Sequence, residues 1–246
     1  MSFINMIKNI KYIPLGIWFY YDVRKIKKNR IAVMRERANG DFEKERIEII
    51  KTGASWGKSV TKKFKVDLHV EGIENIPEGS VLFASNHQGY MDIPVFFSAI
   101  DNKQFGFVAK DGLSKIPVFS EVMKEVRSIF IKRDDPRASL KTINEGVELL
   151  KNGFSLAIFP EGTRSKSSKT GEFKKGSLRL ATKSKVPVVP VSIGNSYKVF
   201  EEKGRFVKNV KINFVIHRPI ETKDLDKKGI NDLYETVENV IIGGIK

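Results

Sequence analysis

Cysteine is absent from the 246 residues of the sequence, and histidine is scarce. The absence of cysteine excludes disulfide bonds, thiolate metal sites and a cysteine nucleophile. The three histidines, His69, His87 and His217, are widely separated along the chain, so their spacing predicts no metal site. His69 and His217 fall within strand-like patterns, where we expect them to be structural or exposed rather than catalytic.

A long apolar run is also missing. The longest uncharged stretch near the N-terminus, Tyr12 to Tyr21, has ten residues. A helix that spans a bilayer needs roughly twice that length, about 20 apolar residues. The stretch also lacks a small-residue cleavage site. The sequence therefore predicts neither a transmembrane helix nor a signal peptide.

Acidic residues are too few to balance the basic ones. Asp and Glu number 29 against 44 Lys and Arg, which gives a formal net charge of +15 at pH 7. Such a charge indicates a polyanionic neighbour: nucleic acid, an anionic membrane surface or a phosphorylated substrate. Because no zinc-finger or RRM signature accompanies the charge, we expect no specific nucleic-acid partner. A basic nucleic-acid-binding module remains the competing interpretation.

Residues 1–64 differ in composition from the rest of the chain. Aromatic residues from Trp18 to Tyr21 precede a basic run, Arg24–Arg30, and a helical pattern rich in lysine follows between Glu43 and Phe64. Aromatic and basic side chains in this arrangement are typical of a segment lying among membrane headgroups. We therefore expect a helical membrane-association segment over 1–64 and an α/β domain over 65–246. A soluble amphipathic helix packed on the domain is the alternative.

Two motifs inside this segment carry little weight. Gly53–Gly57 matches the G-x-S-x-G pattern of a nucleophile elbow, and Gly53–Ser59 is one residue short of a phosphate-binding P-loop. Both motifs require a preceding strand, and the flanking residues here are typical of an amphipathic helix. We expect the small residues beside Trp56 to let a helix pack closely or dip into lipid.

From Lys65 onward, short apolar runs alternate with helical patterns. This alternation predicts an α/β fold with a mostly parallel central sheet of about seven strands, flanked by helices on both faces. The expected strands are Lys65–Val70, Val81–Ala84, Phe105–Ala109, Ser128–Ile131, Phe154–Phe159, Val188–Ile193 and Val210–Ile216. The expected helices are Ile93–Ile100, Val118–Val126, Pro136–Lys151, Lys175–Lys183 and Ile230–Ile242.

A histidine and an aspartate follow the buried strand Val81–Ala84. His87 lies in a polar turn, and Asp92 stands at the start of the next helix, which it can cap. Such strand-to-helix junctions are usual ligand sites in α/β folds. If the loop folds Asp92 onto one imidazole nitrogen, the other nitrogen is free to accept a proton. The missing nucleophile suits a substrate that brings its own hydroxyl; a helix cap beside an ordinary loop histidine is the alternative.

A second buried strand, Phe154–Pro160, leads into the loop Glu161–Ser165. This loop places a glycine, a hydroxyl group and Arg164 at a strand end. Forked guanidinium donors and nearby backbone N–H groups suit a phosphate group. The pattern therefore favours a phosphate site, and an ordinary turn with a solvated arginine is the alternative.

Together the two segments resemble the glycerolipid acyltransferases. Four blocks carry the resemblance and occur in the family's order: Asn86-His87-x4-Asp92, Ser128–Arg133, Phe159–Ser165 and Val186–Val191. They cover the chain from about Val81 to Ile193, and neither the N-terminal segment nor the C-terminal tail takes part in the match.

The resemblance implies a role for each matched residue. It implies that His87, oriented by Asp92, is a general base that activates a glycerol hydroxyl for direct attack on an acyl thioester. It nominates Arg164 and Arg133 as cations for the substrate phosphate, in a pocket shaped by the remaining loop residues Glu161, Gly162 and Thr163. Lys110 is a further phosphate candidate, on its position at a strand end alone.

The resemblance also implies the substrates. The expected acceptor is lysophosphatidic acid (1-acyl-glycerol-3-phosphate), acylated at its sn-2 hydroxyl, and the expected donor is acyl carrier protein or coenzyme A carrying a thioester. No cofactor is expected. We expect a peripheral or monotopic protein on the cytoplasmic face of the cell membrane, in contact with its anionic surface. Acyltransferases for glycerol-3-phosphate or another lysophospholipid, and a non-catalytic basic membrane-binding protein, remain alternatives.

Overall fold

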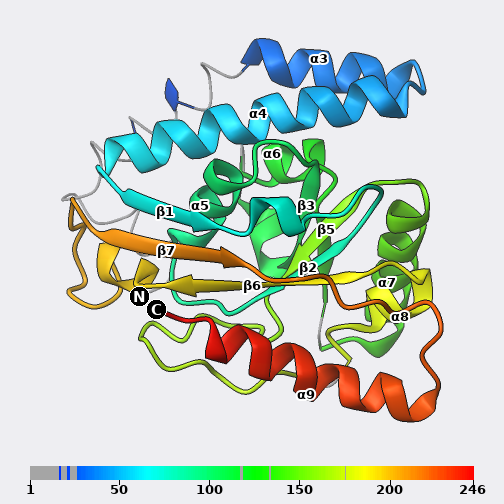
Figure 1. The fold of residues 1–246 in the computed structure, drawn as a ribbon. Helices are drawn as coiled ribbons and strands as arrows, with labels where there is room; N and C mark the ends of the chain where they lie inside the picture. Colours follow the sequence, from blue (N-terminus) through cyan, green and yellow to red (C-terminus); the bar gives the residue numbers. More distant parts are fainter. Residues whose placement is uncertain (1–16, 18–20, 23–26, 117–118, 133, 175) are drawn as a thin grey trace.

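The computed structural model describes residues 17, 21–22, 27–116, 119–132, 134–174 and 176–246. Its centre is a seven-stranded sheet in the order β1-β7-β6-β2-β5-β3-β4 (Figure 1). Every pair of neighbouring strands is parallel except β6 and β7, which are antiparallel. The predicted mostly parallel sheet is thus confirmed. The strands are β1 (Asp67–Glu71), β2 (Leu82–Ser85), β3 (Phe105–Lys110), β4 (Ile129–Ile131), β5 (Ser155–Ile158), β6 (Val188–Gly194) and β7 (Lys211–Ile216).

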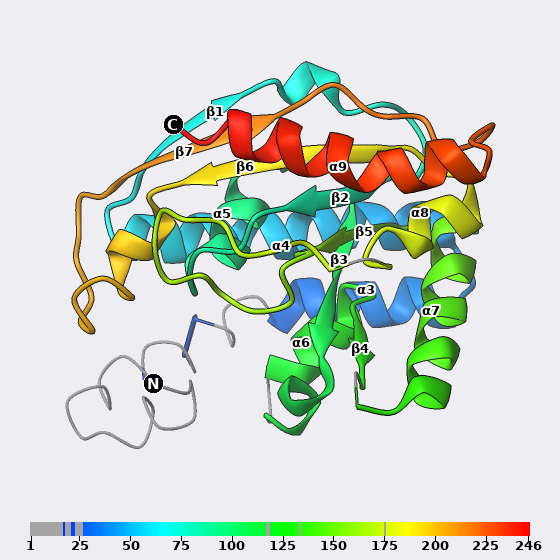
Figure 2. The same cartoon turned by 90° about the horizontal axis from the view of Figure 1, so that it is seen from below.

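Helices cover both faces of the sheet, as Figures 1 and 2 show. One face is covered by α4 (Phe42–Lys63), α5 (Asp92–Ala99) and α6 (Phe119–Glu125), and α3 (Lys27–Ala38) packs against α4 and α6. The other packs on α7 (Pro136–Lys151), α8 (Arg179–Ser184) and α9 (Lys227–Gly243). The described residues also form the short 3-10 helices η2 (Ile73–Asn75), η3 (Asp111–Lys115) and η4 (Ser196–Val199).

The central strand β2 is buried along its whole length. Phe83 points into the core under α4 and α5, whereas Leu82 and Ala84 point into the core under α7 to α9. Successive side chains of a strand alternate between the two faces. Because both faces of β2 are covered, each of its four positions is buried, and its sequence shows no alternation of apolar and polar residues.

Helix α8 is shorter than the sequence predicts. It begins at Arg179 rather than at Lys175. Gly176 has φ of +98°, a left-handed backbone conformation that a right-handed helix cannot contain. The residues from Gly176 to Leu178 therefore form a turn before the helix.

The described part of the N-terminal segment shares a core with the α/β domain. Val33 of α3 and Ile49 and Trp56 of α4 belong to the same apolar cluster as Phe97 of α5. The predicted lysine-rich helix is confirmed as α4. Among the described residues, no helix has the length and apolar character needed to span a bilayer. The aromatic and basic runs at Trp18–Tyr21 and Arg24–Arg30 lie largely outside the described residues, so the membrane contact and the separate segment 1–64 stay predictions.

A buried ion-pair network ties these helices to the domain. Glu45 of α4 is fully buried and accepts hydrogen bonds from Arg37 (2.7 Å) and, through both carboxylate oxygens, from Arg127 (2.7 and 2.6 Å). Arg127, just before β4, also lies over the ring of Phe154, 4.5 Å from its centroid. Glu45 therefore joins α3, α4 and the turn into β4 through one carboxylate.

The glycines of the G-x-S-x-G match lie inside α4, where they permit close helix packing. A Cβ added at Gly53 would lie 2.5 Å from the Phe97 ring, and one added at Gly57 would lie 2.7 Å from the backbone nitrogen of Ser98. Both contacts are with α5, the helix that begins at Asp92. The expectation of a closely packed helix is confirmed, and no strand precedes the motif in the described chain from residue 27 onward.

We expect Gly57→Ala to lower the free energy of unfolding by a net ~1–2 kcal/mol. The added methyl group meets backbone that cannot move independently, and overpacking of this kind outweighs the roughly 1 kcal/mol gain in helix propensity. Urea denaturation measures the difference. Gly243→Ala is the matched control, because a Cβ there meets nothing within 4 Å. An unchanged or raised stability of Gly57→Ala would contradict the close packing.

Candidate active site

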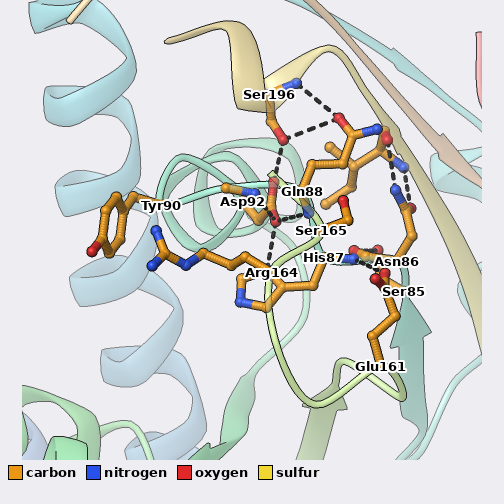
Figure 3. A network of polar contacts seen from close by, with 12 residues as sticks. Ser85, Asn86, His87, Gln88, Tyr90, Asp92, Glu161, Arg164, Ser165 and Ser196 are labelled. Atoms are coloured by element: carbon orange, nitrogen blue, oxygen red, sulfur yellow. Dashed lines mark hydrogen bonds and ion pairs between the residues drawn. The ribbon is translucent and has the colours of Figure 1, made fainter. Parts of the chain in front are cut away.

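The predicted histidine–aspartate pair forms in the loop between β2 and α5. The Nδ1 atom of His87 lies 2.6 Å from Oδ2 of Asp92 (Figure 3). Asp92 is the first residue of α5 and is fully buried, whereas the side chain of His87 is 17% exposed. The loop thus brings together two residues whose five-residue spacing would separate them on a regular helix.

The Asp92 carboxylate is held by three further donors. The backbone N–H groups of Gln88 and Gly89 donate to Oδ2 at 2.7 and 2.9 Å. The hydroxyl of Ser196, in η4, donates to Oδ1. A carboxylate surrounded by donors is fixed in place and has no rotational freedom left to lose when substrate binds.

This arrangement sets the tautomer of His87. Because the carboxylate accepts, Nδ1 carries the proton and Nε2 carries the free lone pair. The imidazole ring also stacks on Phe159, with the ring centroids 4.0 Å apart and the planes within 12°. The stacking and the aspartate together present Nε2 as a proton acceptor with a fixed direction.

The loop after β5 pairs directly with the histidine loop. Ser165 N–H donates to the carbonyl of His87 at 2.8 Å, and Lys166 N–H donates to the carbonyl of Gln88 at 3.1 Å. This pairing is possible because β2 and β5 are parallel neighbours whose carboxyl ends share one edge of the sheet. The two motifs, more than seventy residues apart in sequence, therefore form one site.

Glu161 connects the loop after β5 to the histidine loop. Its carboxylate accepts from the His87 N–H at 2.6 Å and from the Gly171 N–H at 2.8 Å. Burial raises the pKa of the Glu161 carboxyl, and these two backbone donors oppose the rise. The side chain holds the backbone on which the imidazole sits.

Arg164 extends along the site beside His87 and Tyr90, as Figure 3 shows. Its guanidinium carbon lies 3.6 Å from the centroid of the Tyr90 ring. Its Nη1 donates to Oε1 of Glu201 at 2.8 Å. The Arg164 side chain is 19% exposed, so the cation faces both the protein and the solvent side of the site.

Comparison with known proteins gives the family. The acyltransferase family model matches residues 67–194, about half of the chain, and includes both loops. A chloroplast 1-acyl-sn-glycerol-3-phosphate acyltransferase of Arabidopsis thaliana is 35% identical over 162 residues, covering 65% of this chain and 45% of its own. A probable 1-acyl-sn-glycerol-3-phosphate acyltransferase of Mycoplasma pneumoniae is 30% identical and is covered over 68% of its length.

The chain belongs to the acyltransferase family.

A crystal structure supports the same assignment for the fold. The 1-acyl-sn-glycerophosphate acyltransferase PlsC of Thermotoga maritima is similar with a TM-score of 0.76 and 32% identity, over 96% of this chain and 95% of that one. Our chain spans slightly under half the length of the chloroplast relative. The resemblance predicted from the four sequence blocks is confirmed at the level of the family.

Of the other predicted site residues, Gly162, Thr163 and Lys110 lie at the same edge of the sheet. Gly162 has φ of +72° and donates its N–H to the Phe159 carbonyl at 2.9 Å, so it forms the turn. Thr163 is exposed, and Lys110 is exposed at the end of β3. Arg133 lies outside the described residues. Phosphate binding by all of them stays a prediction.

Sequence reasoning missed Ser196 and Glu201. Both follow β6, about one hundred residues after the histidine loop they contact. The parallel pairing of β2 with β6 brings them there, and Asn86 reinforces it by exchanging two 2.8 Å hydrogen bonds with the backbone of Ile193. No local pattern distinguishes these two residues. Among the described residues, no cluster of three metal-ligating side chains occurs.

Proposed function

We propose that the protein transfers a fatty acyl group from an acyl thioester to the sn-2 hydroxyl of 1-acyl-glycerol-3-phosphate, making phosphatidic acid. The observation that carries the proposal is the junction of the two loops. It places a histidine with a fixed free nitrogen beside an arginine, within a chain of the acyltransferase family. The named relatives are 1-acyl-sn-glycerol-3-phosphate acyltransferases, which supports this acceptor.

The proposed reaction needs one base and no covalent enzyme intermediate. Nε2 of His87 takes the proton of the glycerol hydroxyl as that oxygen forms a bond to the thioester carbonyl carbon. The tetrahedral oxyanion then collapses, the carbon–sulfur bond breaks, and the imidazolium returns the proton to the leaving thiolate. A positioned base of this kind contributes about 10²–10⁴ to the rate.

The proposed substrates also account for the charge of the chain. The acceptor carries a phosphate, and a donor attached to acyl carrier protein or coenzyme A is anionic. A chain with a net charge of +15 attracts both, as well as an anionic membrane surface. We place the protein peripherally on the cytoplasmic face of the membrane, where a lipid acceptor and a soluble donor meet.

The test is acyl transfer by the full-length protein in detergent micelles. Acyl-coenzyme A and acyl-acyl carrier protein serve as donors, and 1-acyl-glycerol-3-phosphate, glycerol-3-phosphate, lysophosphatidylcholine and monoacylglycerol serve as acceptors. We expect phosphatidic acid as the main product. A preference for glycerol-3-phosphate or lysophosphatidylcholine would change the acceptor, and transfer to none of the four would reject the proposal.

We expect Arg164→Ala to raise the acceptor KM by roughly 10–100-fold with a smaller change in kcat. Charge-assisted hydrogen bonds to phosphate contribute about 1.5–3 kcal/mol, and each 1.4 kcal/mol is tenfold in affinity. The same assay with monoacylglycerol, which has no phosphate, should show little effect. Arg137→Ala, an exposed arginine in α7, is the matched control. An equal loss with both acceptors would contradict a phosphate contact.

A further inference from the structure

Glu201 is a buried acid that contacts the site from outside the matched region. It follows η4 and lies beyond residue 194, where the match to the family model ends. Its side chain is only 3% exposed. Oε1 accepts from Nη1 of Arg164 at 2.8 Å and from the backbone N–H of Tyr90 at 2.8 Å. One carboxylate oxygen thus joins the arginine to the histidine loop.

The carboxyl group of Glu201 lies in a buried environment that disfavours its charged form. Burial raises the pKa of the Glu201 carboxyl, and the charge of Asp92 adds to the rise; the Tyr90 N–H and Arg164 oppose it. Oε2 is buried and has no hydrogen-bond partner among the described residues. A buried carboxylate with one unsatisfied oxygen is unfavourable unless a nearby cation compensates its charge. Arg164 is that cation.

The histidine loop is shaped to admit this carboxylate. A Cβ at Gly89 would lie 2.4 Å from Oε2 of Glu201, well inside contact distance. Gly89 also donates its N–H to Asp92. The loop that orients the imidazole therefore has a glycine at the point where Glu201 packs, and any larger residue would displace either the carboxylate or the loop.

Glu201 occupies one end of the Arg164 guanidinium and leaves the rest free. Nη1 is held by the carboxylate, and the plane of the group is held against the Tyr90 ring. A guanidinium has five N–H donors, so Nη2 and Nε remain as a fork for a second anion. No hydrogen bond from those two nitrogens occurs within the described part of the chain.

We propose that Glu201 is a positioning residue that fixes the Arg164 guanidinium for the acceptor phosphate. The inference rests on the proposed function, because it names the residue through which that site orients its phosphate-binding arginine. Glu201 does not touch the reacting atoms. Without it, Arg164 must give up side-chain freedom each time the acceptor binds, and the affinity falls accordingly.

A double-mutant cycle on acceptor KM tests this role. In the wild-type protein, which keeps Arg164, Glu201→Gln preserves the side-chain volume but removes the charge. We expect the acceptor KM to rise about tenfold with the donor KM unchanged. In the Arg164→Ala background, the same substitution should change acceptor KM less than about twofold, because coupled residues are not additive. Glu202→Gln, which removes the exposed charge of the next residue in the sequence, is the matched control. Equal effects in both backgrounds would overturn the proposal.

A second measurement does not depend on turnover. Nuclear magnetic resonance of the arginine side chains reports rotation of the Arg164 guanidinium, which we expect to be hindered in the wild type and averaged in Glu201→Gln. Hindered rotation in both proteins would overturn the positioning role even if the acceptor KM rose in Glu201→Gln. Wild-type protein that orders Arg164 but transfers no acyl group to 1-acyl-glycerol-3-phosphate would reject the proposed function while leaving this contact in place.

Discussion

Replacing His87 with alanine is expected to lower kcat by about 10²–10⁴-fold, the contribution of a positioned general base. Nε2 is the free nitrogen of an imidazole whose other nitrogen is fixed by Asp92 at 2.6 Å. Alanine removes the proton acceptor while leaving the Asp92 carboxylate its two backbone donors and the Ser196 hydroxyl. The fold around the site should therefore persist in the variant.

The measurement is the initial rate at saturating donor and acceptor, together with a thermal melt. We expect both KM values to change little, because the base acts on the transition state rather than on binding. His69→Ala is the matched control, since His69 is 48% exposed and pairs with Asp67 at the surface. Its kcat should match the wild type.

A kcat loss below tenfold for His87→Ala, with an unchanged melt, would reject His87 as the base. The His87–Asp92 pair would then serve to cap α5 and hold the loop. If wild-type protein transfers acyl groups to no glycerolipid acceptor but binds anionic vesicles tightly, the competing interpretation of a non-catalytic membrane-binding protein would stand instead.

The strands were predictable because burial on both faces leaves a simple pattern. β2 and β6 are mainly apolar and buried at every position, and their bounds in the structure match the predicted ones within one residue. The strand order was not predictable. β7 pairs with both β1 and β6, and its antiparallel pairing with β6 depends on contacts that no local run encodes.

The site was predictable as far as it is local. The His87–Asp92 contact spans five residues, so the loop and the helix start that create it can be read together in the sequence. Ser196 and Glu201 reach the site only through the pairing of β2 with β6. A hydroxyl and a carboxylate in a polar stretch are common on protein surfaces. The sequence alone therefore does not show that these two side chains are buried against the site.

Replacing Glu45 with alanine is expected to lower the free energy of unfolding by about 3 kcal/mol, the lower end of the range for breaking a buried ion pair. The substitution leaves Arg37 and Arg127 without their shared counter-ion. Their side chains are 30% and 22% exposed, so water reaches them in part and moderates the loss. Arg37 also keeps its hydrogen bonds to the carbonyls of Lys124 and Glu125.

Urea denaturation measures this effect, and Glu148→Ala provides the control. Glu148 is 65% exposed and pairs with Lys151 on the surface of α7, where removal of the charge should change stability by less than about 0.5 kcal/mol. The loss of stability in Glu45→Gln should lie between those of Glu45→Ala and Glu148→Ala, because glutamine keeps a hydrogen-bond acceptor but not the charge. A Glu45→Ala loss no larger than the control would show that apolar packing alone holds α3 and α4.

The consequence of the Glu45 substitution extends to the active site. α4 packs closely on α5 through Gly53 and Gly57, and α5 begins at Asp92. Loosening α4 therefore weakens the support of the carboxylate that orients His87. We expect Glu45→Ala to retain kcat at low temperature and to lose activity on heating before the wild type does. Loss of kcat at low temperature, with an intact melt, would instead indicate a direct role of Glu45 in the site.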